Sequence, residues 1–283
     1  MEKHRKKLIK NAAVFDGHSS GLVQGKKIVI EDDIVTEITA DEVSEENFDE
    51  VFDGTGMVAM PGMTDAHVHM GCLFAKGEFP VDYATVLTVA KCKDALMAGF
   101  TTFRDAGSVS EGLKLAFDEG VLPGPRIYPC GAYISQTCGH GDSEYAHTYR
   151  DIQYRHPSST VLADGVPEII RAVREQFYRG ASHIKLMATE ILNRHEDIRL
   201  LFGTDMMITG PDYQVEQSED IRYYEKRFGT MRALRALTGT ANEVFALTTY
   251  QNPYPKGKIG VLEARSYADL LLVDGDPTKS VSV

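Results

Sequence analysis

The chain has 283 residues, 43% of them hydrophobic and 25% charged, which suffices for one large globular domain or for a large and a small one. Its net charge of −11 and acidic pI argue against nucleic acid or an anionic membrane as a partner. No stretch approaches the ~20 apolar residues of a membrane span, and the basic start, MEKHRKKLIK, does not continue into the apolar core of a secretory signal.

The four cysteines, Cys72, Cys92, Cys130 and Cys138, show no CxxC spacing. So few cysteines in a chain of this length are typical of free thiols in a reducing compartment rather than of a disulfide framework. The sequence therefore predicts a cytoplasmic protein.

Residues 8–58 have the pattern of short strands joined by turns. The segment KKIVIEDDIVTEI, at 26–38, carries apolar residues on both sides of the turn-forming pair Asp32-Asp33, which predicts a hairpin. An acidic, exposed connection is expected at 41–50.

From residue 61 the pattern changes to alternating strands and helices. Strands are expected in MTDAHVHM (63–70), FTTFRDAG (100–107) and PRIYPCGAY (125–133), with helices at 82–99 and 110–120. The helices should stop at Gly99 and Gly120. A segment rich in Gly, His, Ser and Tyr follows at 133–165, and it is too long for a plain connection.

The second half continues the alternation. A helix is expected after residue 165, with Asp164 as its N-cap and Pro167 in its first turn. The segment HIKLMAT (183–189) is predicted to be the fourth strand. The expected elements after it are a short helix at 190–199, a strand at 200–205, helices at 230–247 and strands at 258–277.

Alternating strands and helices imply a parallel sheet, and repetition of that unit implies a (β/α) barrel. The β-rich segments at the two ends can pair outside it. We therefore predict an α/β fold, a TIM-type (β/α) barrel over 61–256, with a composite β-sandwich formed by 1–60 and 257–283.

The motif Asp65-Ala66-His67-Val68-His69 is the strongest chemical signal. Alternate positions of a strand point the same way, so His67 and His69 should face one side, which at the C-terminal end of a barrel strand is the mouth. Two imidazoles suit Zn, Mn or Fe better than Ca or Mg. The spacing alone leaves two solvent-facing or core histidines as an equal alternative.

The chain resembles the amidohydrolase superfamily in a combination of motifs. These are PGMTDAHVHM after a β-rich start, GFTTFRDAG, HIKLMAT and FGTD. The nearest likeness is to its metal-dependent dipeptidase- or carboxypeptidase-like branch, with Xaa-Pro dipeptidase-like (prolidase-like) enzymes. The resemblance covers nearly the whole chain. It implies hydrolysis of an amide or peptide bond in a small molecule or dipeptide by a metal-activated hydroxide. A cyclic-amide hydrolase or deaminase of the same superfamily is the alternative.

The resemblance also implies roles for four residues. His67 and His69 would bind the more buried of two divalent ions, and a carboxylated Lys185 would bridge both ions. Asp205 would bind metal, orient the water and act as general base. A desolvated lysine beside cations is pushed toward its neutral amine, which can capture carbon dioxide. A lysine that only extends from a strand end toward solvent is the structural alternative for Lys185.

Other polar residues near the expected mouth are less specific. Arg104 and Asp105 are expected to form an ion pair, and the resemblance implies that the loop with His140 and Asp142 shapes the substrate pocket. Surface positions are expected for three other histidines, His147, His156 and His195. No GxxxxGK[ST] or GxSxG motif occurs, so neither a P-loop nor a serine-hydrolase elbow is supported.

The family barrel takes two more histidine ligands from strands five and six, yet Lys185 and Asp205 lie only 20 positions apart. Three missing units would amount to roughly 90 to 130 residues, with the break near Thr189-Glu190. One explanation is a non-catalytic remnant that lacks strands five to seven, in which strand eight pairs beside strand four. The other, which we favour because every retained element is well patterned, is a stretch absent from the sequence as printed. A homo-oligomer is a further alternative that the sequence leaves open.

Overall fold

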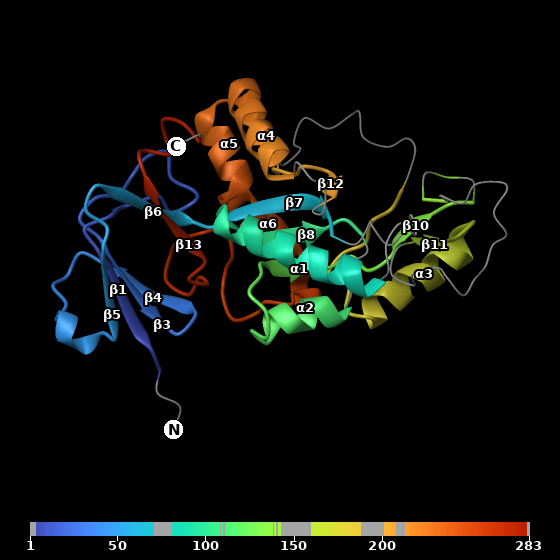
Figure 1. Ribbon diagram of the computed structural model, residues 1–283, viewed down its shortest axis with the longest axis horizontal. Coiled ribbons are helices and arrows are strands. Elements are labelled where there is room, and N and C mark those ends of the chain that lie inside the picture. The colour runs from blue at the N-terminus through green and yellow to red at the C-terminus, as the bar shows by residue number, and fades with distance from the viewer. Residues whose placement is uncertain are drawn as a thin grey trace.

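The computed structural model describes residues 4–70, 81–107, 109, 111–137, 139, 141–142, 160–187, 201–207 and 213–281. Figure 1 shows a β-rich end that contains the N-terminus, a central α/β part, and a smaller group of elements at the opposite end.

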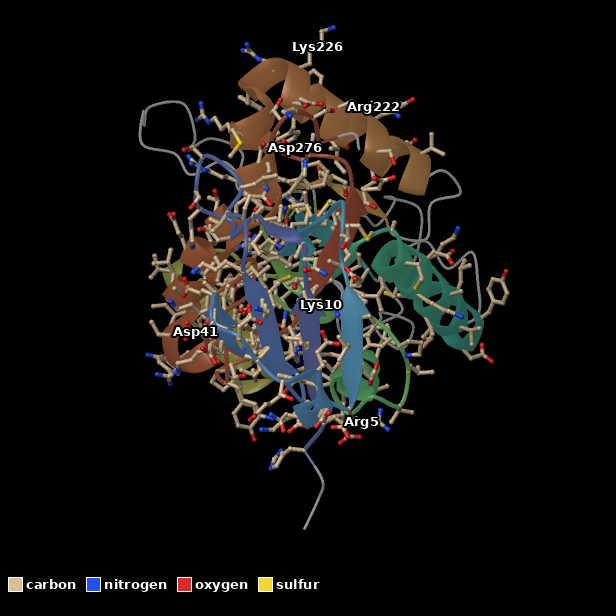
Figure 2. All side chains as sticks on the ribbon, turned by 90° about the vertical axis from the view of Figure 1, so that its left-hand side faces the viewer. Arg5, Lys10, Asp41, Arg222, Lys226 and Asp276 are labelled. Atoms are coloured by element: carbon tan, nitrogen blue, oxygen red, sulfur yellow. The ribbon has the colours of Figure 1, made fainter. Side chains whose placement is uncertain are left out.

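The β-rich end contains a sheet in the order β4-β3-β1-β5. Its strands are β1 (Lys6–Lys10), β3 (Lys27–Glu31), β4 (Ile34–Thr39) and β5 (Glu50–Asp53), and the 3-10 helix η1 (Glu45–Asn47) precedes β5. The antiparallel pair β3 and β4 confirms the predicted hairpin, and Asp32 occupies its turn with φ 55°. Figure 2 shows this end of the molecule with Lys10 and Asp41.

A second sheet joins both ends of the chain. It contains β13 (Leu270–Asp274), β6 (Met57–Pro61) and β2 (Ala13–Val14), and β13 runs antiparallel to β6. Ile9, Ile28, Ala59 and Leu262 belong to one buried cluster that both sheets contribute to. The domain boundaries at 60/61 and 256/257 stay a prediction.

The central sheet is parallel, in the order β12-β7-β8-β9. Its strands are β12 (Met206–Met207), β7 (Met63–His69), β8 (Phe100–Asp105) and β9 (Arg126–Tyr128). Beyond β9, β10 (Tyr133–Ser135) pairs with β11 (Thr160–Leu162), and Ile134 bridges to Leu186 of the predicted fourth strand. The α/β fold is confirmed, and within the described ranges the strands form an open array rather than a closed barrel.

The position of strand eight differs from the expectation for a truncated chain. It pairs with strand one, through Met206 opposite Val68, and not beside strand four. Phe202, just before β12, is fully buried, and its ring lies 6.0 Å, centroid to centroid, from that of Phe100 in β8. Among the described residues, the pairing places strands eight, one, two, three and four in the order of a barrel that is open on one side.

Helices cover one face of this sheet (Figure 1). These helices are α1 (Val81–Met97), α2 (Glu111–Asp118), α4 (Tyr213–Phe228) and α5 (Thr230–Leu237). All four helices contribute to one buried core that includes Val68, for example through Cys92, Leu113, Ile221 and Leu237. The predicted α1 and α2 are confirmed, whereas α4 was not predicted.

The remaining helices are α3 (Val166–Tyr178), α6 (Gly239–Phe245) and the 3-10 helix η3 (Ala246–Gln251). Gly165, not Asp164, is the N-cap of α3, so that prediction was wrong. The Asp164 carboxylate accepts the Thr137 amide N–H at 3.0 Å instead. No described helix combines the length and the apolar character needed to cross a membrane.

Three expected strands differ in detail. The third is split into β9 and β10, since Pro129 has no N–H and Gly131 adopts φ 69°. The described part of HIKLMAT makes one isolated bridge, at Leu186. Residues 201–205 precede β12 without regular strand pairing, and the predicted helix at 190–199 lies outside the described residues.

Candidate metal centre

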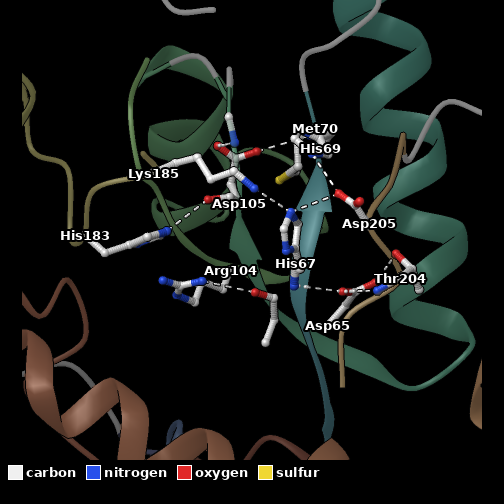
Figure 3. A network of polar contacts seen from close by, with 12 residues as sticks. Asp65, His67, His69, Met70, Arg104, Asp105, His183, Lys185, Thr204 and Asp205 are labelled. Carbon is white, nitrogen blue, oxygen red and sulfur yellow. Dashed lines mark hydrogen bonds and ion pairs between the residues drawn. The ribbon is translucent and has the colours of Figure 1, made fainter. Parts of the chain in front are cut away.

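Strand β7 brings the two histidines together. The rings of His67 and His69 lie 5.5 Å apart, centroid to centroid, as expected for alternate positions near the end of a strand. His69 is the more buried, with 12% of its side chain exposed against 36% for His67. Figure 3 shows both rings beside the carboxylate of Asp205.

Asp205, directly before β12, lies beside the two histidines. Its Oδ1 atom lies 2.9 Å from Nε2 of His67 and 3.2 Å from Nε2 of His69. Its backbone N–H donates to the carbonyl of His67 at 2.7 Å, and its φ of 56° is a left-handed value that aspartate adopts more readily than most residues. One carboxylate oxygen therefore lies within hydrogen-bond distance of both imidazole nitrogens.

These three side chains fit a divalent metal ion. Their ligand atoms all lie within 4.8 Å of one another, and among the described His, Cys, Asp and Glu residues they form the one such group. Atoms that bind the same tetrahedral zinc ion lie roughly 3.3 Å apart, close to the two separations at Asp205 Oδ1. The donor set, two nitrogens and a carboxylate oxygen, suits Zn, Mn or Fe.

The protonation state of His67 agrees with this use. Burial and, as a smaller cause, the positive charge of Lys185 lower the pKa of His67 to about 4. His67 is therefore neutral at physiological pH, and a neutral imidazole is the form that binds a metal.

Lys185 reaches the group from the fourth strand. Its Nζ lies 2.9 Å from Nε2 of His67, and its partly buried side chain comes from the residue next to the Leu186 bridge. The structure thus brings together all four predicted metal-binding residues, His67, His69, Lys185 and Asp205. Their individual roles stay predictions.

Several neighbours were not predicted. Asp65 is fully buried and accepts hydrogen bonds from His67 N–H at 3.1 Å and from the Thr204 hydroxyl at 2.9 Å. Gly203 lies against His67, where a Cβ atom would fall 2.7 Å from Cβ of His67. Asp65 could have been found from its position in the Asp-x-His-x-His motif, whereas Gly203 and Thr204 required the pairing of strands one and eight.

His183 is a further neighbour that was not predicted. Its Nε2 lies 3.1 Å from the Asp105 carbonyl oxygen, and its Nδ1 lies 3.0 Å from the Ser182 hydroxyl. Burial lowers its pKa to about 3, and the nearby Arg104 acts in the same direction. The signal in the sequence was its position two residues before Lys185.

The expected ion pair of Arg104 and Asp105 is not formed. Arg104 donates to the Ala66 carbonyl at 3.3 Å, while the buried Asp105 accepts the backbone N–H groups of Met70, Gly107 and Val109. Successive residues of a strand point to opposite faces, which separates the two charges.

The remaining predictions concern loops and thiols. Asp142 donates its backbone N–H to the Gly139 carbonyl in a turn after β10, and its part in a substrate loop stays a prediction. Cys92 and Cys130 are buried free thiols, as expected. Six residues singled out from the sequence lie outside the described residues, namely His140, His147, His156, His195, Cys72 and Cys138.

Comparison with known proteins shows which family the central part of the chain resembles. An amidohydrolase family model matches residues 58–196, which include β7, β8, β9, α3 and Lys185. Over these residues the chain is similar to the amidohydrolase family. The resemblance predicted from its motifs is thereby confirmed at the level of the superfamily.

The chain is similar to ochratoxinase from Aspergillus niger, with 34% identity over 152 residues, 47% of this chain and 31% of that protein. It is similar to imidazolonepropionase from Picrophilus torridus, with 39% identity over 176 residues, 58% of this chain and 43% of that protein. The matched part of the chain thus spans less than half the length of either relative.

The fold is similar to that of a prolidase crystallised with N-methylphosphonate-L-proline. The TM-score is 0.81 at 21% identity, over 98% of this chain and 95% of the prolidase chain. The likeness to the prolidase-like branch therefore holds for the fold.

Proposed function

We propose that this chain is a metal-dependent hydrolase that cleaves a C–N bond in a small amide or dipeptide. The observation that carries the proposal is the convergence of His67 Nε2 and His69 Nε2 on one oxygen of Asp205, at 2.9 and 3.2 Å. The likeness to an ochratoxinase and a prolidase supports an amide bond as the target.

In this proposal His67, His69 and Asp205 hold one divalent ion, with zinc as the expected metal. A bound ion supplies Lewis-acid chemistry, because it lowers the pKa of water and polarises the carbonyl of the amide. Lys185, 2.9 Å from His67, is the residue proposed to be carboxylated and to extend the site toward a second ion.

Asp205 is proposed to handle the protons. It is the most exposed of the three ligands, with 72% of its side chain accessible, so a substrate and a water can both reach its carboxylate. Its oxygen takes a proton from the attacking water and passes it to the leaving nitrogen, which departs as a free amine. No covalent intermediate with the protein is required.

A cyclic-amide hydrolase is the second candidate. The likeness to an imidazolonepropionase favours it, because an imidazolone ring contains a cyclic amide. A cytoplasmic location and a homo-oligomeric state remain predictions.

The test is an assay of the chelator-treated chain before and after zinc or manganese is restored. The substrates are an Xaa-Pro dipeptide, an N-acyl amino acid and a cyclic amide, with free amine and ammonia measured separately. We expect metal to restore amine release from an acyclic substrate. Ring opening alone would favour the second candidate, and release of ammonia would indicate a deaminase. A folded, metal-loaded chain without any activity would indicate a non-catalytic remnant.

Two variants complete the assay. Asp205→Asn should reduce turnover by about 100-fold or more, the size expected when a general base is lost. Asp41→Asn is the matched control, since Asp41 is an exposed aspartate at the β-rich end (Figure 2). It should leave turnover unchanged.

A further inference from the structure

A single buried carboxylate contacts both strands of the candidate metal centre. Oδ1 of Asp65 accepts the backbone N–H groups of His67 and Thr204, at 3.1 and 3.3 Å. Its Oδ2 accepts the Thr204 hydroxyl at 2.9 Å and the side-chain amide of Gln217 at 3.4 Å. Asp65 is fully buried, and Gln217 is 2% exposed. Figure 3 shows Asp65 between His67 and Thr204.

An irregularity in β7 directs Asp65 away from the metal ligands. Asp65 is paired with Phe103 and Val68 with Asp105, so β7 has one residue more than β8 between these pairs. Paired residues of parallel strands share a face, and Phe103 and Val68 both belong to the core beneath the helices. The bulge therefore allows Asp65 to point toward α4, on which Gln217 lies, while His67 and His69 meet Asp205.

The hydrogen bonds of Asp65 hold the backbone at and next to the proposed metal ligands. One bond holds the backbone of His67, and two hold Thr204, the residue before Asp205. The Asp205 N–H in turn donates to the His67 carbonyl at 2.7 Å. Because Asp205 has the uncommon φ of 56°, the direction of its carboxylate depends on this backbone being held.

We propose that Asp65 is the positioning residue of the metal centre, which sets the distance of Asp205 from His67 and His69 without binding the ion. This inference rests on the proposed function and deepens it. In this inference, Thr204 connects strand eight to β7 through Asp65, and Gln217 connects α4 to β7 through the same carboxylate. Groups that orient metal ligands commonly change metal affinity by about 10- to 100-fold when they are removed.

The test measures metal affinity directly, by calorimetric titration of zinc into the chelator-treated chain and by the visible absorption of bound cobalt. Asp65→Asn places an amide NH₂ where Oδ2 accepts two hydrogen bonds. We expect its Kd to rise by about 10- to 100-fold, with a changed cobalt spectrum. Thr204→Val, which lacks the hydroxyl, should also raise the Kd and change the cobalt spectrum. Thr204→Ser, which keeps a hydroxyl, should have the Kd and the spectrum of the parent chain.

Asp269→Asn is the control for loss of a partly buried carboxylate. Asp269 is bound by Arg126 at 2.6 Å, in a contact that does not involve the metal ligands. We expect it to lower the melting temperature without changing the Kd or the cobalt spectrum. A purely structural role for Asp65 predicts the same result for Asp65→Asn.

Each outcome has a definite meaning. Unchanged affinity in folded Asp65→Asn, or in Thr204→Val if Asp65→Asn does not fold, overturns the positioning role and leaves the proposed function intact. Failure of the folded parent chain to bind zinc or cobalt overturns both. Weaker binding in Asp65→Asn and Thr204→Val, with recovery in Thr204→Ser, supports the inference.

Discussion

Gly203 and His67 pack so closely that a methyl group on Gly203 would lie 2.7 Å from Cβ of His67 and 3.0 Å from its backbone nitrogen. These separations are far below a van der Waals contact, so the chain before Asp205 approaches β7 only because residue 203 has no side chain. The glycine thereby fixes the approach of strand eight to the first histidine ligand.

Gly203→Ala should therefore damage the metal centre without changing any ligand. We expect the displacement of His67 or of the 203–205 backbone to weaken zinc binding by about tenfold or more, the range seen when ligand orientation is disturbed. Gly112→Ala is the control, because Gly112 lies in α2 and a Cβ there meets nothing within 4 Å. Equal zinc affinity in both variants and the parent would show that the close contact is unimportant.

Lys185 provides a chemical test of carboxylation. If its amine carries carbon dioxide, chelator-treated chain reloaded with zinc in bicarbonate should be more active than chain reloaded in CO₂-free buffer, by about tenfold. Lys185→Gln should abolish the bicarbonate effect, and Lys226→Gln, which replaces an exposed lysine of α4, should retain it. A bicarbonate effect that persists in Lys185→Gln would exclude carboxylation of this lysine as its cause.

The neutral, partly buried His183 predicts a loss of stability in acid. Its folded-state pKa of about 3 lies below the value near 6.5 expected when unfolded, so between these values the unfolded chain binds a proton that the folded chain does not. The stabilisation is complete above pH 6.5 and is lost as the pH falls toward 3.

Urea unfolding of the metal-free chain at pH 7 and pH 5 measures this effect. For a shift of this size we expect His183 to account for about 2 kcal/mol of the decrease in unfolding free energy, and His183→Gln to remove that share. His67, with its pKa lowered to about 4, contributes in the same direction and remains in the variant. An identical pH dependence in parent and variant would mean that His183 is not kept neutral by the fold.

The sheet order also predicts the mass of the natural protein. Strand eight lies beside strand one, and the Leu186 bridge of strand four lies at the other margin of the array. Strands five to seven would fit between these margins, so we expect an intact mass above 31.3 kDa by roughly 10 to 14 kDa, about three barrel units. A mass of 31.3 kDa would show that these units are truly absent.

Local patterns predicted much of this fold. The hairpin around Asp32, the strand of His67 and His69, and the helices that end before Gly99 and Gly120 follow from alternation, helical spacing and glycine stops. The motifs also identified the four residues that the structure brings together at the candidate metal centre. The predictions of strands, helices and the hairpin succeeded because each depends on short-range sequence, whereas the roles of the four site residues, which the resemblance implied, stay predictions.

The features that were missed depend on contacts between distant segments. The role of Asp65 arises from a bulge in β7 and from Gln217, 152 positions later, on a helix that was not predicted. The pairing of strand eight with strand one joins Met206 to Val68, residues that lie far apart in the sequence. The supposed Arg104–Asp105 pair failed because adjacency in a strand separates side chains.

The most direct test of the account is the metal content of the purified, folded chain after exhaustive dialysis, measured by elemental mass spectrometry. The convergence of His67, His69 and Asp205 predicts close to one tightly held transition-metal ion per chain. It also predicts the loss of that ion in the His67→Asn, His69→Asn double variant. A folded parent chain without metal, or a double variant that retains as much metal as the parent, would contradict the account.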